Sequence, residues 1–237
     1  MDWNSITGEP LFGIALTLAV YAAATSFHSR VRWAHPVVVT CAALFAVLHV
    51  THVRLENYHA GADYIPYLLG PATVALGVPM YKHARTLKRS LRVLGVSVCL
   101  GALVGMITAG LTAGWLGAPR ELVMSAIPKS VTTPIAIEVA RQLHGLPEVT
   151  AGMAVIAGLA GSIVCLPILR FAGVSNDLAV GAAMGTSSHA IGTARLLRES
   201  ELQASVSSLA MAMAGIATSL FAIPIPWISR LLTAFHG

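Results

Sequence analysis

The chain has 237 residues, of which 56% are hydrophobic and only 11% charged, and its mean hydropathy is +0.74. Soluble globular domains carry about 25% charged residues, so this composition excludes that class and favours a membrane protein. The net charge is +5, which in a membrane protein reports loop topology rather than nucleic-acid binding. We therefore expect the lipid bilayer as a partner and no nucleic acid.

Long stretches of the chain lack Asp, Glu, Lys and Arg altogether. They cover residues 10–29, 33–53, 64–81, 93–119, 149–169, 178–194 and 202–229. About 20 mainly apolar residues cross a bilayer as a helix, and continuous apolar runs exclude the alternating pattern of a membrane β-barrel. With the less apolar stretch 122–140, the sequence predicts an all-α polytopic membrane protein with about seven or eight segments. We expect residues 1–237 to form a single transmembrane domain, and the first ten residues resemble neither a signal nor a transit peptide.

The basic residues predict how the segments are oriented. The densest cluster lies within 82–92 and holds five cations, so the positive-inside rule places it in the cytoplasm. Counting from it, residues 51–63 and both chain ends are external, while 122–140 and 178–194 each cross inward. Arg120 and Arg170 then fall outside, which fits the rule poorly. A re-entrant course of one short segment would give seven crossings and would move the C-terminus to the other side.

Three short segments are interrupted by Pro or Gly. They read PATVALGVP from Pro71, PKSVTTP from Pro128 and GTSSHAIG from Gly185, and they start 57 residues apart. This spacing indicates internal repeats, although the identities are few enough to fit coincidence as well. Interrupted segments in corresponding positions are the sequence indicator of a transporter binding site.

The chemistry of an interrupted membrane helix suits a small anion. A break frees backbone groups that must face protein or water, and the restarting helix presents N–H groups and a positive dipole end. Lys129 lies well inside 122–140, where a cation costs about 2.5–3.5 kcal/mol, so a substrate carboxylate is one candidate partner. We expect residues 187–189 to lie at a helix break and to face residues 128–134. The predicted substrate-binding residues are Thr73, Lys129, Ser130, Thr132, Thr133, Ser187, Ser188, His189, Thr193 and Arg195.

Each of these residues also has a structural interpretation. Ser and Thr in membrane helices commonly bond to the carbonyl one turn back. Lys129 could instead reach the interface or pair with Glu121, His189 could be a neutral residue of the bundle, and Arg195 fits a cytoplasmic anchor. If His189 is functional, it is the candidate for a coupling proton. The rival proton sites are His28, His35 and His49.

The sequence does not indicate catalysis. Ser188 and His189 are adjacent and would point about 100° apart on a helix, and no acid stands near to orient the imidazole. Cys41, Cys99 and Cys165 lie singly in apolar runs, without a CxxC motif or a His/Cys cluster. We therefore expect no enzyme activity, no metal and no cofactor.

Two of the interrupted segments carry a resemblance to a known family. PKSVTTPIA (128–136) and GTSSHAIGTAR (185–195) resemble the LrgB/CidB family, and LGPATVALGVPMY (69–81) fits a third block of it. The resemblance covers roughly residues 60–235. Bacterial members are named for control of murein hydrolase activity, as antiholin-like partners of small LrgA/CidA membrane proteins. A plant plastid protein with an LrgB-like half exchanges glycolate and glycerate, and some bacterial members are linked to pyruvate uptake.

The resemblance thus implies two functions. The anion-binding pattern favours membrane transport of small monocarboxylates of the glycolate, glycerate and pyruvate class, by proton coupling or by exchange. The alternative is an antiholin-like regulator of murein hydrolase activity and cell lysis, which works with an LrgA/CidA-type partner and transports no substrate. On either function we expect a multi-pass protein of the bacterial inner membrane that forms a homo-oligomer.

Overall fold

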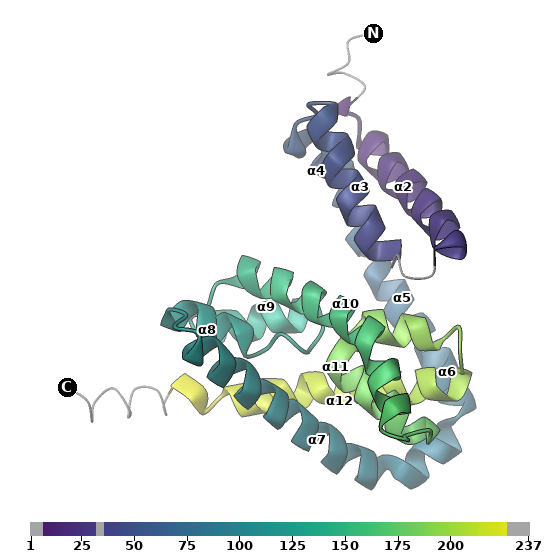
Figure 1. Ribbon diagram of the computed structural model, residues 1–237, viewed down its shortest axis with the longest axis vertical. Coiled ribbons are helices and arrows are strands. Elements are labelled where there is room, and N and C mark those ends of the chain that lie inside the picture. The colour runs from purple at the N-terminus through teal and green to yellow at the C-terminus, as the bar shows by residue number, and fades with distance from the viewer. Residues whose placement is uncertain (1–6, 32–35, 227–237) are drawn as a thin grey trace, which may run out of the picture. The chain divides into compact units, whose positions relative to one another are not determined.

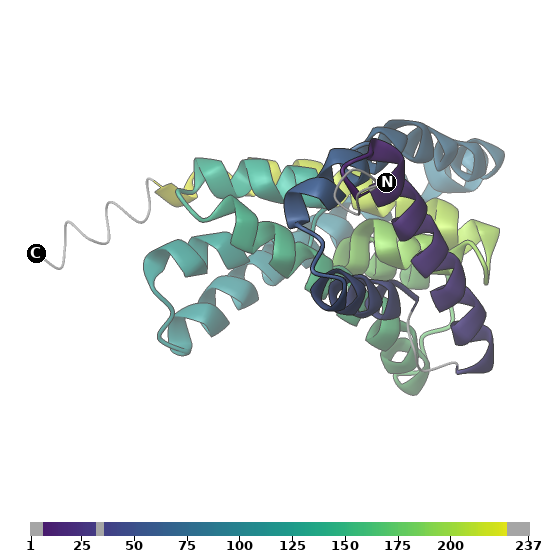
Figure 2. The ribbon, with the colours of Figure 1, turned by 90° about the horizontal axis from the view of Figure 1, so that it is seen from above.

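The computed structural model describes residues 7–31 and 36–226, so His35 and the first six residues lie outside the described part. Within that part, every regular element is a helix (Figures 1 and 2). This confirms the all-α fold class. The contacts divide the chain into two units, Met1–Ala75 and Leu76–Gly237, and each is described by itself.

The first unit is built around a long apolar helix. Its elements are α2 (Pro10–Arg30), α3 (Pro36–Val50), α4 (Leu55–Ala62), η1 (Ile65–Leu68) and α5 (Leu69–Ala75). α2 packs against α3 and α4. Thr17 Oγ1 lies 2.9 Å from the Tyr58 hydroxyl, and a Cβ at Gly13 would come within 2.7 Å of the Ala62 nitrogen. Glycine therefore allows α2 and α4 to approach closely.

The second unit holds the remaining helices. They are α6 (Gly77–Lys82), α7 (Ala84–Trp115), α8 (Arg120–Ala126), α9 (Thr133–Gln142), α10 (Pro147–Phe171), α11 (Asp177–Leu196) and α12 (Glu201–Ala222). Gly117 and Gly173 follow the ends of α7 and α10 with φ of 75° and 72°, a conformation that glycine adopts without steric cost. The Asn176 side chain caps α11 by accepting from the Leu178 and Ala179 amides.

The distribution of side chains is that of a membrane protein. Four helical stretches, Pro10–His28, Ala84–Trp115, Pro147–Phe171 and Glu201–Ala222, are long and apolar enough to span a bilayer. Large apolar side chains such as Ile107 and Ile216 are exposed, whereas hydroxyls such as those of Ser125 and Ser207 are buried. Apolar surface outside and small polar groups inside suit a chain surrounded by lipid.

In the second unit, α7 and α12 pack together and run in the same direction (Figure 1). At one end, just before α7 begins, Lys82 Nζ lies 2.7 Å from Glu201 Oε1. Near the other end, Met106 and Ala222 belong to one buried cluster. We refer to these ends as the Lys82 end and the Trp115 end of the unit.

α10 runs in the opposite direction. Near its start, Thr150 Oγ1 donates to the Ser125 carbonyl of α8 at 3.0 Å, at the Trp115 end. In its last turn, Arg170 lies 3.3 Å from Glu199, which precedes α12 at the Lys82 end. α10 therefore leads the chain from the Trp115 end to the Lys82 end.

α8 and α9 form a hairpin that enters from the Trp115 end and returns to it. A Cβ at Gly110 of α7 would lie 3.5 Å from Ile127, and one at Gly105 would lie 3.8 Å from Ser130 Oγ. The turn thus reaches about 15 Å inward from the end of α7, at 1.5 Å per residue. Leu143, just after α9, packs again in the cluster that holds Ile127.

α11 is also a hairpin, and it enters from the Lys82 end. His189 has φ 39° and ψ −132°, which interrupts the helix. A Cβ at Gly192 would lie 2.7 Å from Met184 Cγ, and Leu196 shares a buried cluster with Val180 and Met184. In a straight helix Met184 and Gly192 would be about 12 Å apart, so the chain must reverse between them.

These two hairpins correct part of the predicted topology. The stretches 122–140 and 178–194 were each expected to cross from one side of the membrane to the other, but both return to the end at which they enter. In the first stretch, α8 ends at Ala126 and α9 restarts at Thr133, because Pro128 and Pro134 cannot donate the backbone bonds of one continuous helix. In the second, the reversal occurs at His189.

Candidate functional site

A cavity of about 950 Å³ lies in the second unit, between α7, the α8–α9 turn, α10 and α11. Glycines of α7 and α10 leave space for it, and most of its other walls are apolar. Its polar lining consists of Ser97, Lys129, Ser130, Asn176, Thr186 and Ser187. Concave apolar sites with a few polar groups are the usual form of a small-molecule site.

Lys129 supplies the positive charge of this cavity. It is half-buried on the turn between α8 and α9, and its Nζ donates to Ser130 Oγ at 3.3 Å. Within residues 7–31 and 36–226 no carboxylate forms an ion pair with it, so the alternative pairing with Glu121 is not made there. The ammonium group is therefore available to an anion that enters the cavity.

Thr186 and Ser187 line the same cavity as Lys129. Their hydroxyls donate to carbonyls one turn back, Thr186 to Ala182 at 2.5 Å and Ser187 to Ala183 at 2.8 Å. A hydroxyl has a single donor, so neither can donate to an anion without releasing its carbonyl. Of the predicted residues, Lys129, Ser130 and Ser187 line one cavity.

Ser188, His189 and Thr193 are buried and do not line the cavity. Ser188 Oγ lies 3.0 Å from Ser187 Oγ, and His189 Nε2 lies 3.0 Å from the Ala154 carbonyl. That distance requires His189 to carry a proton on Nε2, because a carbonyl only accepts. Thr193 Oγ1 donates to the His189 carbonyl at 2.8 Å.

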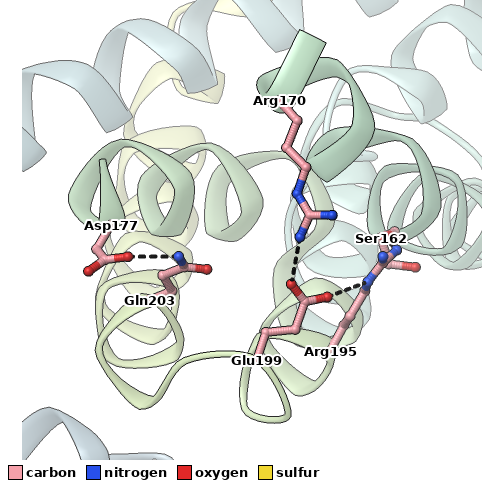
Figure 3. A network of polar contacts seen from close by, with 6 residues as sticks. All are labelled: Ser162, Arg170, Asp177, Arg195, Glu199 and Gln203. Atoms are coloured by element: carbon pink, nitrogen blue, oxygen red, sulfur yellow. Dashed lines mark hydrogen bonds and ion pairs between the residues drawn. The ribbon is translucent and has the colours of Figure 1, made fainter. Parts of the chain in front are cut away.

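Arg195 lies in the last turn of α11 and does not line the cavity. Figure 3 shows its polar contacts. Its Nη1 donates to the Ser162 carbonyl, and its Nε lies 3.5 Å from Glu199. Glu199 also pairs with Arg170. These contacts fit the structural interpretation of Arg195.

Two other predicted residues of the second unit do not line this cavity. Thr132 and Thr133 begin α9 but do not line the cavity, and the Thr132 hydroxyl makes no capping bond. Thr73 belongs to α5 of the first unit, and its side chain lies outside the described part of the chain.

Sequence reasoning missed the contribution of α7. Ser97, Gly101 and Gly105 of α7 line the cavity, and a Cβ at Gly101 would lie 3.2 Å from Thr186 Cγ2. The four-residue spacing of the two glycines was a usable signal, because it places both on one helix face. Nothing in the sequence distinguishes Ser97 from other serines. In the described part of the chain, no group of three or more His, Cys, Asp or Glu residues could hold a metal ion.

Comparisons with known proteins identify the family of the chain. The model of the LrgB-like family matches residues 17–228. YxaC of Bacillus subtilis is 36% identical over 92% of this chain and 96% of its own length. The holin-like protein CidB of Staphylococcus epidermidis is 27% identical over 90% of this chain and 93% of its own, and CidB of Staphylococcus aureus is 26% identical over 92% and 95%. No solved structure matches significantly. The match over most of its length shows that this membrane protein belongs to the LrgB-like family.

Proposed function

We propose that the protein moves a small monocarboxylate across the membrane through the cavity around Lys129. The observation that carries this proposal is an ammonium group in a largely apolar cavity, with no protein carboxylate paired to it in the described residues. A cation at that depth costs about 2.5–3.5 kcal/mol, and a bound carboxylate offsets this cost. We propose binding and release without catalysis.

The family resemblance narrows the proposed substrate to the glycolate, glycerate and pyruvate class. Uptake is driven by protons or by exchange, and His189 is the proposed proton site because it is a buried histidine two residues after Ser187, which lines the cavity. His28 and His49 belong to the first unit and remain rivals.

The proposed membrane arrangement has eight segments in the bacterial inner membrane. α2, α3, the broken stretch 64–81, α7, α10 and α12 cross, while the α8–α9 and α11 hairpins are re-entrant. The family model spans both units, which supports one LrgB-like domain over 1–237. The 57-residue spacing relates the turns of the two hairpins, and we propose that the hairpins are internal repeats. We also propose that the protein assembles as a homo-oligomer.

The test is uptake by proteoliposomes that hold this protein alone. Labelled glycolate, glycerate, pyruvate and lactate are supplied outside, with and without a pH gradient. We expect uptake of at least one acid and its loss in Lys129→Gln, while Lys88→Gln, the same change on an exposed lysine, behaves as the parent. Failure of the parent to take up any of the four acids overturns transport of this class, and full uptake by Lys129→Gln removes Lys129 from the site.

A second candidate function is favoured by the names of the relatives. Two of the similar proteins are named holin-like protein CidB, and these names support an antiholin-like regulator better than they support a transporter. On this function, the protein acts with an LrgA/CidA-type partner to control murein hydrolase activity and lysis. Co-expression with such a partner, followed by a lysis assay, tests it. If lysis control persists in Lys129→Gln, the result supports a regulator and not a transporter.

A further inference from the structure

The cavity around Lys129 is long, and two of its walls give its length. Along α7 its lining begins at Val93 and ends at Gly105, which is about 18 Å at 1.5 Å per residue. Along α11 its lining runs from Asn176 to Ser187, which is about 16 Å. The two helices therefore line one passage that leads to Lys129.

The outer part of this passage lies at the Lys82 end. Asp177, the first residue of α11, accepts from Gln203 Nε2 at 2.7 Å (Figure 3), and Gln203 lies in the first turn of α12, which begins at that end. Asn176 and Ala179, which line the outer part, are exposed. The passage is therefore accessible at the Lys82 end.

The inner part is closed by the turn between α8 and α9. Ser130 on this turn lies beside Gly105, where a Cβ would be 3.8 Å from Ser130 Oγ. Beyond Gly105, Met106 of α7 and Ile127 belong to one buried apolar cluster. Residues 106–115 of α7, all of which the structure describes, do not line the cavity. About 15 Å of helix therefore separates the cavity from the Trp115 end, at 1.5 Å per residue.

Between these two parts, α7 meets α11 at Gly101 and Thr186. A Cβ at Gly101 would lie 3.2 Å from Thr186 Cγ2, so the Thr186 methyl group rests on the backbone of α7. The Thr186 hydroxyl donates to the Ala182 carbonyl, and this bond fixes the orientation of the methyl group. A methyl group added at position 101 would therefore narrow the route to Lys129.

The wall that α11 provides is fixed. Thr193 Oγ1 lies 2.7 Å from Ser207 Oγ of α12, and His189 Nε2 lies 3.0 Å from the Ala154 carbonyl of α10. These residues are buried, and breaking such bonds leaves buried polar groups unpaired. The width of the passage therefore depends on the side chains at positions 101 and 186 and not on a movement of α11.

We infer that this passage is a half-channel by which a small anion reaches Lys129 from the Lys82 end and not from the Trp115 end, and that the contact between Gly101 and Thr186 sets its width. Ser130 Oγ accepts from Lys129 Nζ, which leaves the Ser130 proton for the anion. The direction of access does not depend on which anion enters; that the anion is a carboxylate rests on the proposed function.

The first experiment asks from which side a thiol at position 130 is reached. Ser130→Cys is placed in a protein whose three native cysteines are replaced by Ser, and charged, membrane-impermeant methanethiosulfonates are applied to intact cells and to inside-out vesicles. Arg85→Cys and Gln142→Cys mark the Lys82 and Trp115 ends. We expect Ser130→Cys to react roughly tenfold faster or more from the side that labels Arg85→Cys, because packed protein blocks the other route. Equal rates from both sides, or a faster reaction from the Gln142→Cys side, overturn the half-channel.

The charge of the reagent tests whether the half-channel favours anions. Each rate at Ser130→Cys is divided by the rate of the same reagent with a free thiol in solution. The negatively charged reagent should then be roughly threefold to tenfold faster than the positively charged one, and Lys129→Gln should remove this preference. Equal corrected rates in the protein that retains Lys129 overturn the preference for anions.

The second experiment changes the width of the passage. Gly101→Ala should slow labelling of Ser130→Cys roughly threefold to tenfold, because the added methyl group meets Thr186. Gly114→Ala on the same helix is the matched control, since a Cβ there meets nothing within 4 Å. Thr186→Ser removes the opposing methyl group and keeps the hydroxyl, so it should restore the rate in the Gly101→Ala protein.

The outcomes separate the half-channel from the proposed function. If Gly101→Ala labels as fast as Gly114→Ala, or if Thr186→Ser does not restore the rate, this contact does not set the width. If Gly101→Ala does not fold, Thr186→Ser decides alone, because it should then label faster than the protein that retains Thr186. Labelling from the Lys82 end in a protein that takes up none of the four acids supports the half-channel and overturns the proposed function. Uptake by a protein that labels equally from both sides does the reverse.

Discussion

Neighbouring serines of the α11 turn have different surroundings although the sequence presents them as a pair. Ser187 is exposed to the cavity, whereas Ser188 is fully buried against α10 near Gly161. The pattern GTSSHAIG predicts that polar groups gather at a helix break, and the break at His189 is present. It could not predict which hydroxyl faces the cavity, because that depends on the rotation of α11 against α10 and α12.

The two serines should therefore respond differently to alanine. Ser187→Ala removes a group that lines the cavity, and we expect KM for carboxylate uptake to rise roughly two- to tenfold with stability unchanged. Ser188→Ala removes a buried hydroxyl and should lower the free energy of unfolding by about 1 kcal/mol with KM unchanged. Uptake kinetics and thermal unfolding in detergent measure the two effects. The reverse pattern would contradict this placement of the cavity.

At the scale of elements, the sequence predicts where helices stop better than where the chain then goes. Pro128 and Pro134 predict the interruption between α8 and α9. The return of α9 depends instead on a tertiary contact, in which Ile135 packs where Gly215 of α12 has no side chain. A single sequence does not reveal such a contact between residues this far apart, so the hairpin was taken for a crossing.

The contact between α11 and α12 requires Gly185. A Cβ at this position would lie 2.9 Å from the Ala210 Cβ and closer still to the Ser207 carbonyl. We expect Gly185→Ala to lower the free energy of unfolding by about 1–3 kcal/mol, the usual cost of overpacking. Gly114→Ala on α7 is the control, because a Cβ there meets nothing within 4 Å, and it should be neutral or slightly stabilising. Equal stability of the two variants, measured by thermal unfolding, would be inconsistent with close packing at Gly185.

For the whole molecule, the re-entrant hairpins exchange the sides on which two basic residues lie. The predicted crossings placed Arg170 outside and Arg141 inside. In the structure, Arg170 shares the Lys82 end with Arg195, while Arg141 lies at the Trp115 end. Counting charges along the sequence could not place Arg141 and Arg170 on these sides, because that method assumes that every segment crosses the membrane.

The Lys82 end should therefore be cytoplasmic throughout. In a background without native cysteines, we expect Arg85→Cys, Ser175→Cys and Arg198→Cys to resist a membrane-impermeant thiol reagent applied to intact cells. Gln142→Cys at the Trp115 end should react. Labelling of positions 175 and 198 from opposite sides would show that α11 crosses the membrane, and labelling of position 85 from outside would invert the whole assignment.

The position of α12 has a consequence for biosynthesis. α12 packs against α6, α7, α9 and α11, and its inward face carries Ser205, Ser207 and Ser208. Neither re-entrant hairpin is long enough to be held in lipid by its own apolar length, and the backbone at its turn needs protein or water around it. Both hairpins are translated before α12, against which α9 and α11 pack. The two hairpins must therefore wait at the translocon, without their packing partner, until α12 has been synthesised. If a ribosome stalls before residue 201, both hairpins should be accessible to protease.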